Sequence, residues 1–111
     1  MSHATVYEAV SQHVPCRHVE WPNDKVPPPP FACYLLDYDK PICAGDVEIA
    51  VRHKWMVELY EKRRDAELEK ALSDTLRDTF GAVRRDENYI ENDNLIQVVW
   101  TFYEIEGEFD G

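Results

Sequence analysis

Glycine, cysteine and long apolar runs are scarce in this chain of 111 residues, and each scarcity excludes a class of protein. With four glycines in total, the chain contains no glycine-rich phosphate-binding loop and no Gly-x-Ser-x-Gly nucleophile motif. No stretch approaches the roughly 18 apolar residues that a membrane span needs. The first residues lack a basic segment followed by an apolar one, so we predict neither a signal peptide nor a membrane partner.

The three cysteines (Cys16, Cys33 and Cys43) are an odd number without a Cys-x-x-Cys pair. This pattern favours reduced thiols in the cytoplasm. Together with His18 they offer four zinc ligands, but structural zinc sites are usually built from closely spaced cysteine pairs. We therefore predict no metal and no cofactor.

Basic residues are also missing from the last part of the chain. The sequence has 22 acidic and 12 basic residues, a formal net charge of −10. Nine of the basic residues lie between Arg52 and Arg85, whereas the residues after Arg85 include eight acids and no lysine or arginine. Because a net-acidic surface repels phosphate, we predict no sequence-specific DNA binding.

A run of four prolines, 27–30, leads directly into the apolar segment that begins at Phe31. Consecutive prolines favour an extended polyproline II conformation. We interpret the run as a stiff connector. A ligand for an SH3-type or WW-type domain is the alternative, but such ligands lie in polar, disordered segments.

Hydrophobic patterning predicts two helices and five strands. A capping box formed by Thr5 and Glu8 predicts a helix at 6–13, and Asp65 and Gly81 are the expected caps of a second helix at 66–79. The expected strands are a short extended segment at 16–21, a strand at 31–39, a long alternating strand at 47–62, a weaker strand at 82–91 and a last strand at 95–106. Residues 40–46 are expected to form a loop.

This order predicts a single α+β domain over residues 1–111, with a mostly antiparallel sheet of four to five strands and two helices packed on it. Residues 106–111 are expected to be a flexible tail. At about 3.3 Å per residue, strand 47–62 spans roughly 50 Å, which is more than a small core needs. Part of it is therefore expected to project from the domain as a β-hairpin arm.

Catalytic chemistry has few candidates. Asp37 and Asp39 are two residues apart on a strand, so both carboxylates would face one side and could hold Mg²⁺ for a nuclease. No lysine stands beside them in a nuclease-like motif, and such pairs are common at strand ends. We interpret His53, between Val51 and Trp55, as a core or interface residue. We predict that the protein is not an enzyme and has no catalytic residues.

Three stretches in order carry a resemblance to a known family. They are Pro28-Pro29-Pro30-Phe31-Ala32-Cys33-Tyr34-Leu35, then Val57-Glu58-Leu59-Tyr60-Glu61-Lys62 before the helix with Asp65 and Leu68-Glu69, then Tyr89-Ile90-Glu91 before Gln97-Val98-Val99-Trp100. Over 14–106 the chain resembles the tail-terminator or tail-completion (head–tail joining) proteins of tailed bacteriophages and prophages. The three stretches are short and apolar, so the resemblance depends on their order and spacing and not on any single motif.

The resemblance implies a structural virion protein that forms a ring, commonly of six subunits, which caps the tail tube and joins it to the head. Its partners would be itself and the tail-tube and neck or connector proteins, and DNA would pass without specific binding. It would stand in the host cytoplasm during assembly and then at the tail–head junction of the virion. A head-closure or neck protein of the same connector is one alternative. An acidic inhibitor or DNA mimic and the metal-dependent nuclease are alternatives of other classes.

Two groups of residues are the candidate sites for this function. The candidate subunit interface consists of aromatic and aliphatic residues of strands 47–62 and 82–91: Trp55, Val57, Leu59, Tyr89 and Ile90. The second group consists of Glu104, Glu106 and Glu108. These acids are expected either to line the DNA path of the ring or to face a basic surface of the neighbouring subunit.

Overall fold

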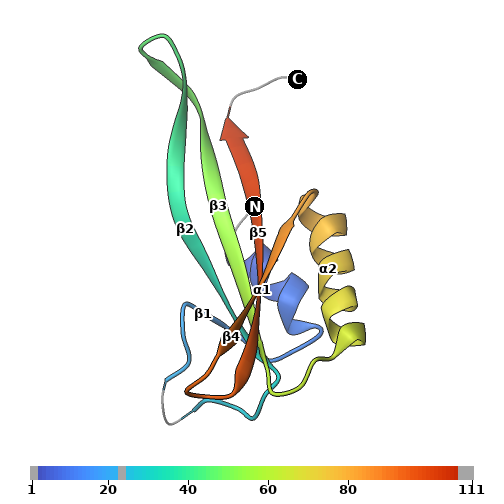
Figure 1. The fold of residues 1–111 in the computed structure, drawn as a ribbon. Helices are drawn as coiled ribbons and strands as arrows, with labels where there is room; N and C mark the ends of the chain where they lie inside the picture. Colours follow the sequence, from blue (N-terminus) through green and yellow to red (C-terminus); the bar gives the residue numbers. More distant parts are fainter. Residues whose placement is uncertain (1–2, 23–24, 108–111) are drawn as a thin grey trace.

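The computed structural model describes residues 3–22 and 25–107, which form two helices and one five-stranded sheet (Figure 1). Along the chain the elements are α1 (His3–Ser11), β1 (Cys16–His18), β2 (Phe31–Ala44), β3 (Val47–Glu61), α2 (Ala66–Phe80), β4 (Arg84–Ile90) and β5 (Leu95–Gly107). Their order in the sheet is β1-β2-β3-β5-β4. The predicted α+β class, the order of elements and the number of helices are confirmed.

The sheet is mixed because β1 pairs with β2 in parallel, whereas the other three pairings are antiparallel. The short β1 covers only residues 32–34 of β2. From Leu35 onward β2 is therefore an edge of the sheet, and β4 forms the other edge.

Both helices pack on one face of the sheet, which we call the inner face. The core combines Val6 and Val10 of α1 with Leu72 and Leu76 of α2. The sheet contributes alternate residues of the three central strands, namely Ala32, Tyr34, Trp55, Val57, Leu59, Val98, Trp100 and Phe102. This alternation is the period-2 pattern of strands with one face in a core.

The predicted caps of α2 are confirmed. The Asp65 carboxylate accepts a hydrogen bond from the Leu68 backbone N–H at 3.0 Å, and Gly81 ends the helix with φ of 89°. The capping box expected for α1 is wrong, because the helix already begins at His3 and therefore includes Thr5. It ends at Ser11, two residues earlier than predicted.

β2 is longer than its sequence predicts. The loop expected at 40–46 is a two-residue turn, in which Gly45 has φ of 65°, as the first central residue of a type II′ hairpin turn does. Lys40 and Pro41 suggested a loop, but Pro41 lies in β2 opposite Val51. Proline is tolerated there because this part of β2 is a sheet edge, where an N–H group is not needed for a second neighbour.

The prolines do not form a straight rod, because the chain bends at residues 28–30. The bend brings Phe31 onto the Tyr60 ring, with the ring centroids 5.2 Å apart and the planes stacked. Trp21 meets Phe31 edge-on and donates a hydrogen bond to the Ala32 carbonyl at 3.0 Å. The predicted strand at 16–21 ends at His18, since Val19 takes a positive φ of 68°.

Candidate functional site

The face of the sheet opposite the helices, which we call the outer face, carries a mixture of apolar, aromatic, basic and acidic side chains. Strand register assigns to it the residues Cys33, Leu35, Tyr38 and Lys40 of β2, Glu48, Arg52, Lys54, Met56, Glu58 and Tyr60 of β3, Gln97, Val99, Thr101, Tyr103 and Ile105 of β5, and Arg84, Asp86 and Asn88 of β4. Neither of the two described helices contributes its core side chains to this face. Tyr38, Tyr103 and Ile105 remain 39–57% exposed, so the face presents apolar surface to solvent.

Cations of the outer face lie on its aromatic rings. The Arg52 guanidinium stands 3.8 Å from the centroid of Tyr103, and the Lys54 amine lies 5.3 Å from that of Tyr38. Lys54 also pairs with the Asp37 carboxylate at 3.1 Å, which raises the pKa of the amine. These contacts hold the charged groups in fixed positions above the sheet.

The same part of the sheet carries acids and one histidine on its inner face. The two nitrogens of the His53 ring face two carboxylates: Nδ1 faces Asp39, and Nε2 lies 3.2 Å from Glu106 Oε2. The hydrogen bond with Asp39, reinforced by Glu106, raises the pKa of His53, and the same histidine lowers the pKa of Glu106. Burial raises the pKa of Glu104, which pairs with His53 across the β3–β5 ladder.

This arrangement contradicts the expectation that Asp37 and Asp39 face one side. A β-bulge between Leu36 and Tyr38 inserts one extra residue into β2. Asp37 therefore reaches Lys54 on the outer face, and Asp39 reaches His53 on the inner face. Since successive residues of β3 point to opposite faces, the two carboxylates do not share a metal.

One set of potential metal ligands gathers within the described ranges 3–22 and 25–107. The ligand atoms of His53, Glu104 and Glu106 lie within 4.8 Å of one another. The four residues weighed as a zinc site do not come together. Cys43 lies near the hairpin turn, ten residues along β2 from Cys33, which corresponds to roughly 33 Å of strand. Burial raises the pKa of Cys16 to about 12 and that of Cys33 to about 11, so both stay thiols.

The candidate interface residues separate into two groups. Trp55, Val57 and Leu59 are at most 3% exposed and belong to the core of the single chain. Their side chains are therefore covered by this chain's own helices. The alternation of apolar residues along β3 marks the face that packs in this chain's core. Tyr89, 61% exposed, and Ile90, half-buried, lie on the edge strand β4, where a neighbour can reach them.

The acidic candidates lie at the end of β5. Glu104 is half-buried and Glu106 is exposed, both within the strand, which extends to Gly107. Glu108 lies outside the described residues. The tail predicted from residue 106 onward therefore includes two residues that are part of the sheet.

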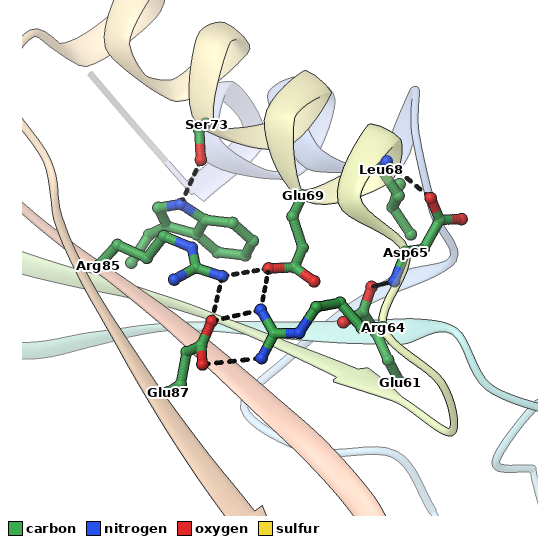
Figure 2. A network of polar contacts seen from close by, with 9 residues as sticks. Glu61, Arg64, Asp65, Leu68, Glu69, Ser73, Arg85 and Glu87 are labelled. Carbon is green, nitrogen blue, oxygen red and sulfur yellow. Dashed lines mark hydrogen bonds and ion pairs between the residues drawn. The ribbon is translucent and has the colours of Figure 1, made fainter.

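Sequence reading missed a polar network between α2 and β4, which Figure 2 shows from close by. Glu69 on the inner side of α2 is buried and pairs with Arg85 and, at 3.4 Å, with Arg64. Arg64 and Arg85 both bind the Glu87 carboxylate, at 2.5 to 2.8 Å, and lower its pKa to about 2. The arginines thus compensate the buried acid and attach the helix to the edge strand.

Glu61, at the end of β3, is 1% exposed. It accepts a hydrogen bond from the Asp65 backbone N–H at 3.3 Å. Burial, together with the neighbouring Glu69 carboxylate, raises the pKa of Glu61 to about 7. The sequence gives no sign of the network around Glu69 and Glu87, because Arg85 is 16 residues from Glu69 and Arg64 is 23 residues from Glu87.

A groove of about 760 Å³ lies where the proline segment crosses the outer face. Apolar residues such as Trp21, Pro29, Phe31, Tyr60 and Leu95 line it together with the charged Glu20, Lys62 and Asp93. Its walls are the residues that fix the bend of the prolines. We assign it a packing role.

No protein-family model matches this chain, and no curated protein matches it at significant similarity. The family resemblance is therefore carried by the three stretches of sequence alone. Among the described residues, no helix is both long enough and apolar enough to cross a membrane.

Proposed function

We propose that this chain is a structural virion protein of the tail-terminator or tail-completion class, which assembles into a ring on the end of a phage tail tube. The observation that supports it best is the part of the β2–β3 hairpin from Asp37 to Lys54, which we call the distal hairpin. β5 ends opposite Ala50, so the last residue pairs of the hairpin have no third strand beside them in the part of the chain that the structure describes. In Figure 1 the turn lies far from both helices.

A hairpin of this kind is costly for an isolated subunit. Within the described residues, no strand pairs with the edge of β2 beyond Tyr34, and exposed edges invite pairing with another chain. The short edge strand β4 is the second open edge of the same sheet. A chain with two different open edges and an outer face that neither described helix covers is suited to bind copies of itself, because each copy offers what the next one leaves unpaired.

The net charge agrees with a place on a DNA path. A ring of chains that each carry −10 repels the phosphates of a duplex that passes through it. Repulsion keeps the DNA mobile and disfavours specific binding. The ring would thus join tail and head and leave the passage open, with no catalytic step.

The direct test is whether the protein stops the growth of tail tubes. Tail-tube protein from the same phage or prophage is polymerised with and without this chain, and tube lengths are measured by negative-stain electron microscopy. We expect shorter tubes that carry the protein at one end. The matched control replaces residues 42–50 with Asn-Gly, which keeps Pro41 opposite Val51 and removes the tip of the distal hairpin. Unchanged tube lengths and no protein at tube ends would contradict the proposal.

A further inference from the structure

The outer and inner faces of the distal hairpin and β5 carry opposite charges. On the outer face the cations are Lys40, Arg52 and Lys54, and the acids are Asp37, which pairs with Lys54, and Glu48 near the turn. On the inner face the acids Asp39, Glu104 and Glu106 surround His53. A chain that is strongly acidic as a whole therefore displays a basic surface on one side of these strands and an acidic surface on the other.

Lys54 is paired with Asp37, but the part of the chain that the structure describes does not neutralise the other two cations of the basic side. Lys40 and Arg52 are register partners across β2 and β3, so two cations stand next to each other. Like charges in directly opposite positions destabilise a strand pair. Among the described residues, no carboxylate forms an ion pair with either of them, and Arg52 instead lies on the Tyr103 ring. Such a surface gains stability when an acidic surface covers it.

From this asymmetry we infer that the binding partner of the basic outer surface around Lys40 and Arg52 is the acidic inner surface around Asp39 and Glu106 of a second copy of this chain. The inference deepens the proposed function, since it names the two surfaces that meet between neighbours in the ring. Stacked sheets pack about 10 Å apart, which places long side chains of both surfaces within reach of one another.

The charge pattern also decides the symmetry. Two copies that met through the same surface would set Lys40 and Arg52 against themselves, or Asp39 and Glu106 against themselves. Contact between unlike surfaces leaves one basic and one acidic surface free on every pair. Such head-to-tail contacts continue until the chain of subunits closes, and therefore produce rings or filaments instead of two-fold dimers.

The accessible acids are placed to make such contacts. The Asp39 and Glu106 side chains are 51% and 52% exposed, although both bind His53. Because about half of each carboxyl side chain reaches solvent, an arginine or lysine of a neighbouring chain can approach it and form charge-assisted hydrogen bonds. Tyr38, Tyr103 and Ile105 beside the cations supply apolar area to the same contact.

The test is charge reversal with rescue, measured by sedimentation velocity at about 50 mM salt, with tail-tube protein added if the wild type needs it. One variant reverses the basic surface (Lys40→Glu with Arg52→Glu), and a second reverses the acidic surface (Asp39→Lys with Glu106→Lys). We expect each to associate at least about tenfold more weakly than the wild type. The second variant is the stronger test. It lowers the magnitude of the net charge, which by itself would favour unspecific association, so weaker association must come from the loss of the specific contact.

Association should return in two ways. A mixture of the two variants can alternate around a ring with every contact attractive, and so can a chain that carries all four substitutions. Two controls keep the charge changes but place them elsewhere: Arg63→Glu with Arg77→Glu, and Glu67→Lys with Asp78→Lys, all exposed side chains. Both controls should assemble like the wild type. Circular dichroism checks that each variant is folded.

The outcomes separate this inference from the proposed function. If the wild type assembles and both reversed variants assemble equally well, the named surfaces are wrong and the ring remains. If the wild type stays monomeric under every condition, the ring itself is contradicted. If a short DNA duplex binds the wild type and not Lys40→Glu with Arg52→Glu, while that variant still assembles, the basic surface serves nucleic acid and the inference is overturned.

Discussion

The Trp100 indole nitrogen donates a hydrogen bond to the Ser73 hydroxyl at 2.8 Å, which joins the centre of β5 to the buried side of α2. Trp100 is completely buried, and Ser73 is 6% exposed. This bond holds the helix over the same strand whose outer side carries the exposed Tyr103 and Ile105. The core therefore fixes the orientation of the surface that we assign to the subunit contact.

Ser73→Ala tests this connection. The substitution leaves a buried N–H group of Trp100 without its acceptor, so we expect unfolding free energy to fall by about 1–3 kcal/mol. Urea denaturation measures the change. Asp78→Ala, on the exposed side of the same helix, should stay within about 0.5 kcal/mol of the wild type. Equal effects of the two substitutions would show that the bond contributes little.

Glu61→Gln tests the buried acid. The folded pKa of Glu61, about 7, lies above its usual value, so the folded state takes up a proton more readily than the unfolded chain. Stability from this group is therefore present at low pH and is lost as the pH rises from about 4.5 to about 7. We expect the two proteins to be similar at pH 5 and the variant to be more stable by about 1 kcal/mol or more at pH 8.5.

Chemical denaturation at both pH values gives this difference. Glu67→Gln is the matched control, since Glu67 is an exposed acid in the first turn of α2. The difference in unfolding free energy between Glu67→Gln and the wild type should be the same at pH 5 and pH 8.5. A Glu61→Gln variant that is less stable than the wild type at pH 8.5 would mean that the ionised carboxylate is favourable where it lies.

His53→Gln tests the contacts on the inner face. Because Asp39 and Glu106 raise the pKa of His53, its stabilisation is complete below about pH 6.5 and is lost as the pH rises through the folded pKa. We expect the variant to be less stable by a few tenths to about 1 kcal/mol at pH 6 and nearly equal at pH 9. Thermal unfolding at the two pH values measures this difference in stability. A loss of stability that is the same at both pH values would exclude the charged histidine as its cause.

Gly45→Ala tests the turn of the distal hairpin. A side chain added at Gly45 meets no atom within 4 Å, so only the positive φ of 65° opposes the substitution. We expect a cost of about 1 kcal/mol, and a smaller one for Gly45→Asn, because asparagine tolerates this conformation. Amide hydrogen exchange at Ile42 and Ala50 should rise in Gly45→Ala before exchange in α2 changes. Unaltered exchange in the hairpin would mean that the turn does not limit its opening.

Local signals in the sequence were sufficient to predict most of the helices and strands. Asp65 and Gly81 delimit α2 because caps act through neighbouring backbone groups, which a sequence shows directly. The long strand β3 followed from its alternation, and its observed end at Glu61 is one residue from the prediction. Regular periodicity of this kind needs no knowledge of distant contacts.

Several of the errors depend on contacts between distant residues. Pro41 lies in a strand because that part of β2 has no neighbour on one side, which only the sheet order reveals. The bulge at Asp37 sends two aspartates to opposite faces, and a single extra residue leaves no mark in the alternation. Nothing local in the sequence marks Glu61 and Glu69 as buried, because burial of Glu61 and the pairing of Glu69 with two arginines both arise from the fold.

The central claim is that this chain assembles into a closed ring on a tail tube, and native mass spectrometry of the protein with its tail-tube protein tests it most directly. We predict one discrete oligomer, of six 13.0 kDa chains, bound to the tube protein and absent from the variant in which Asn-Gly replaces residues 42–50. A monomer or a two-fold dimer at every protein concentration, with or without the tube protein, would contradict the account.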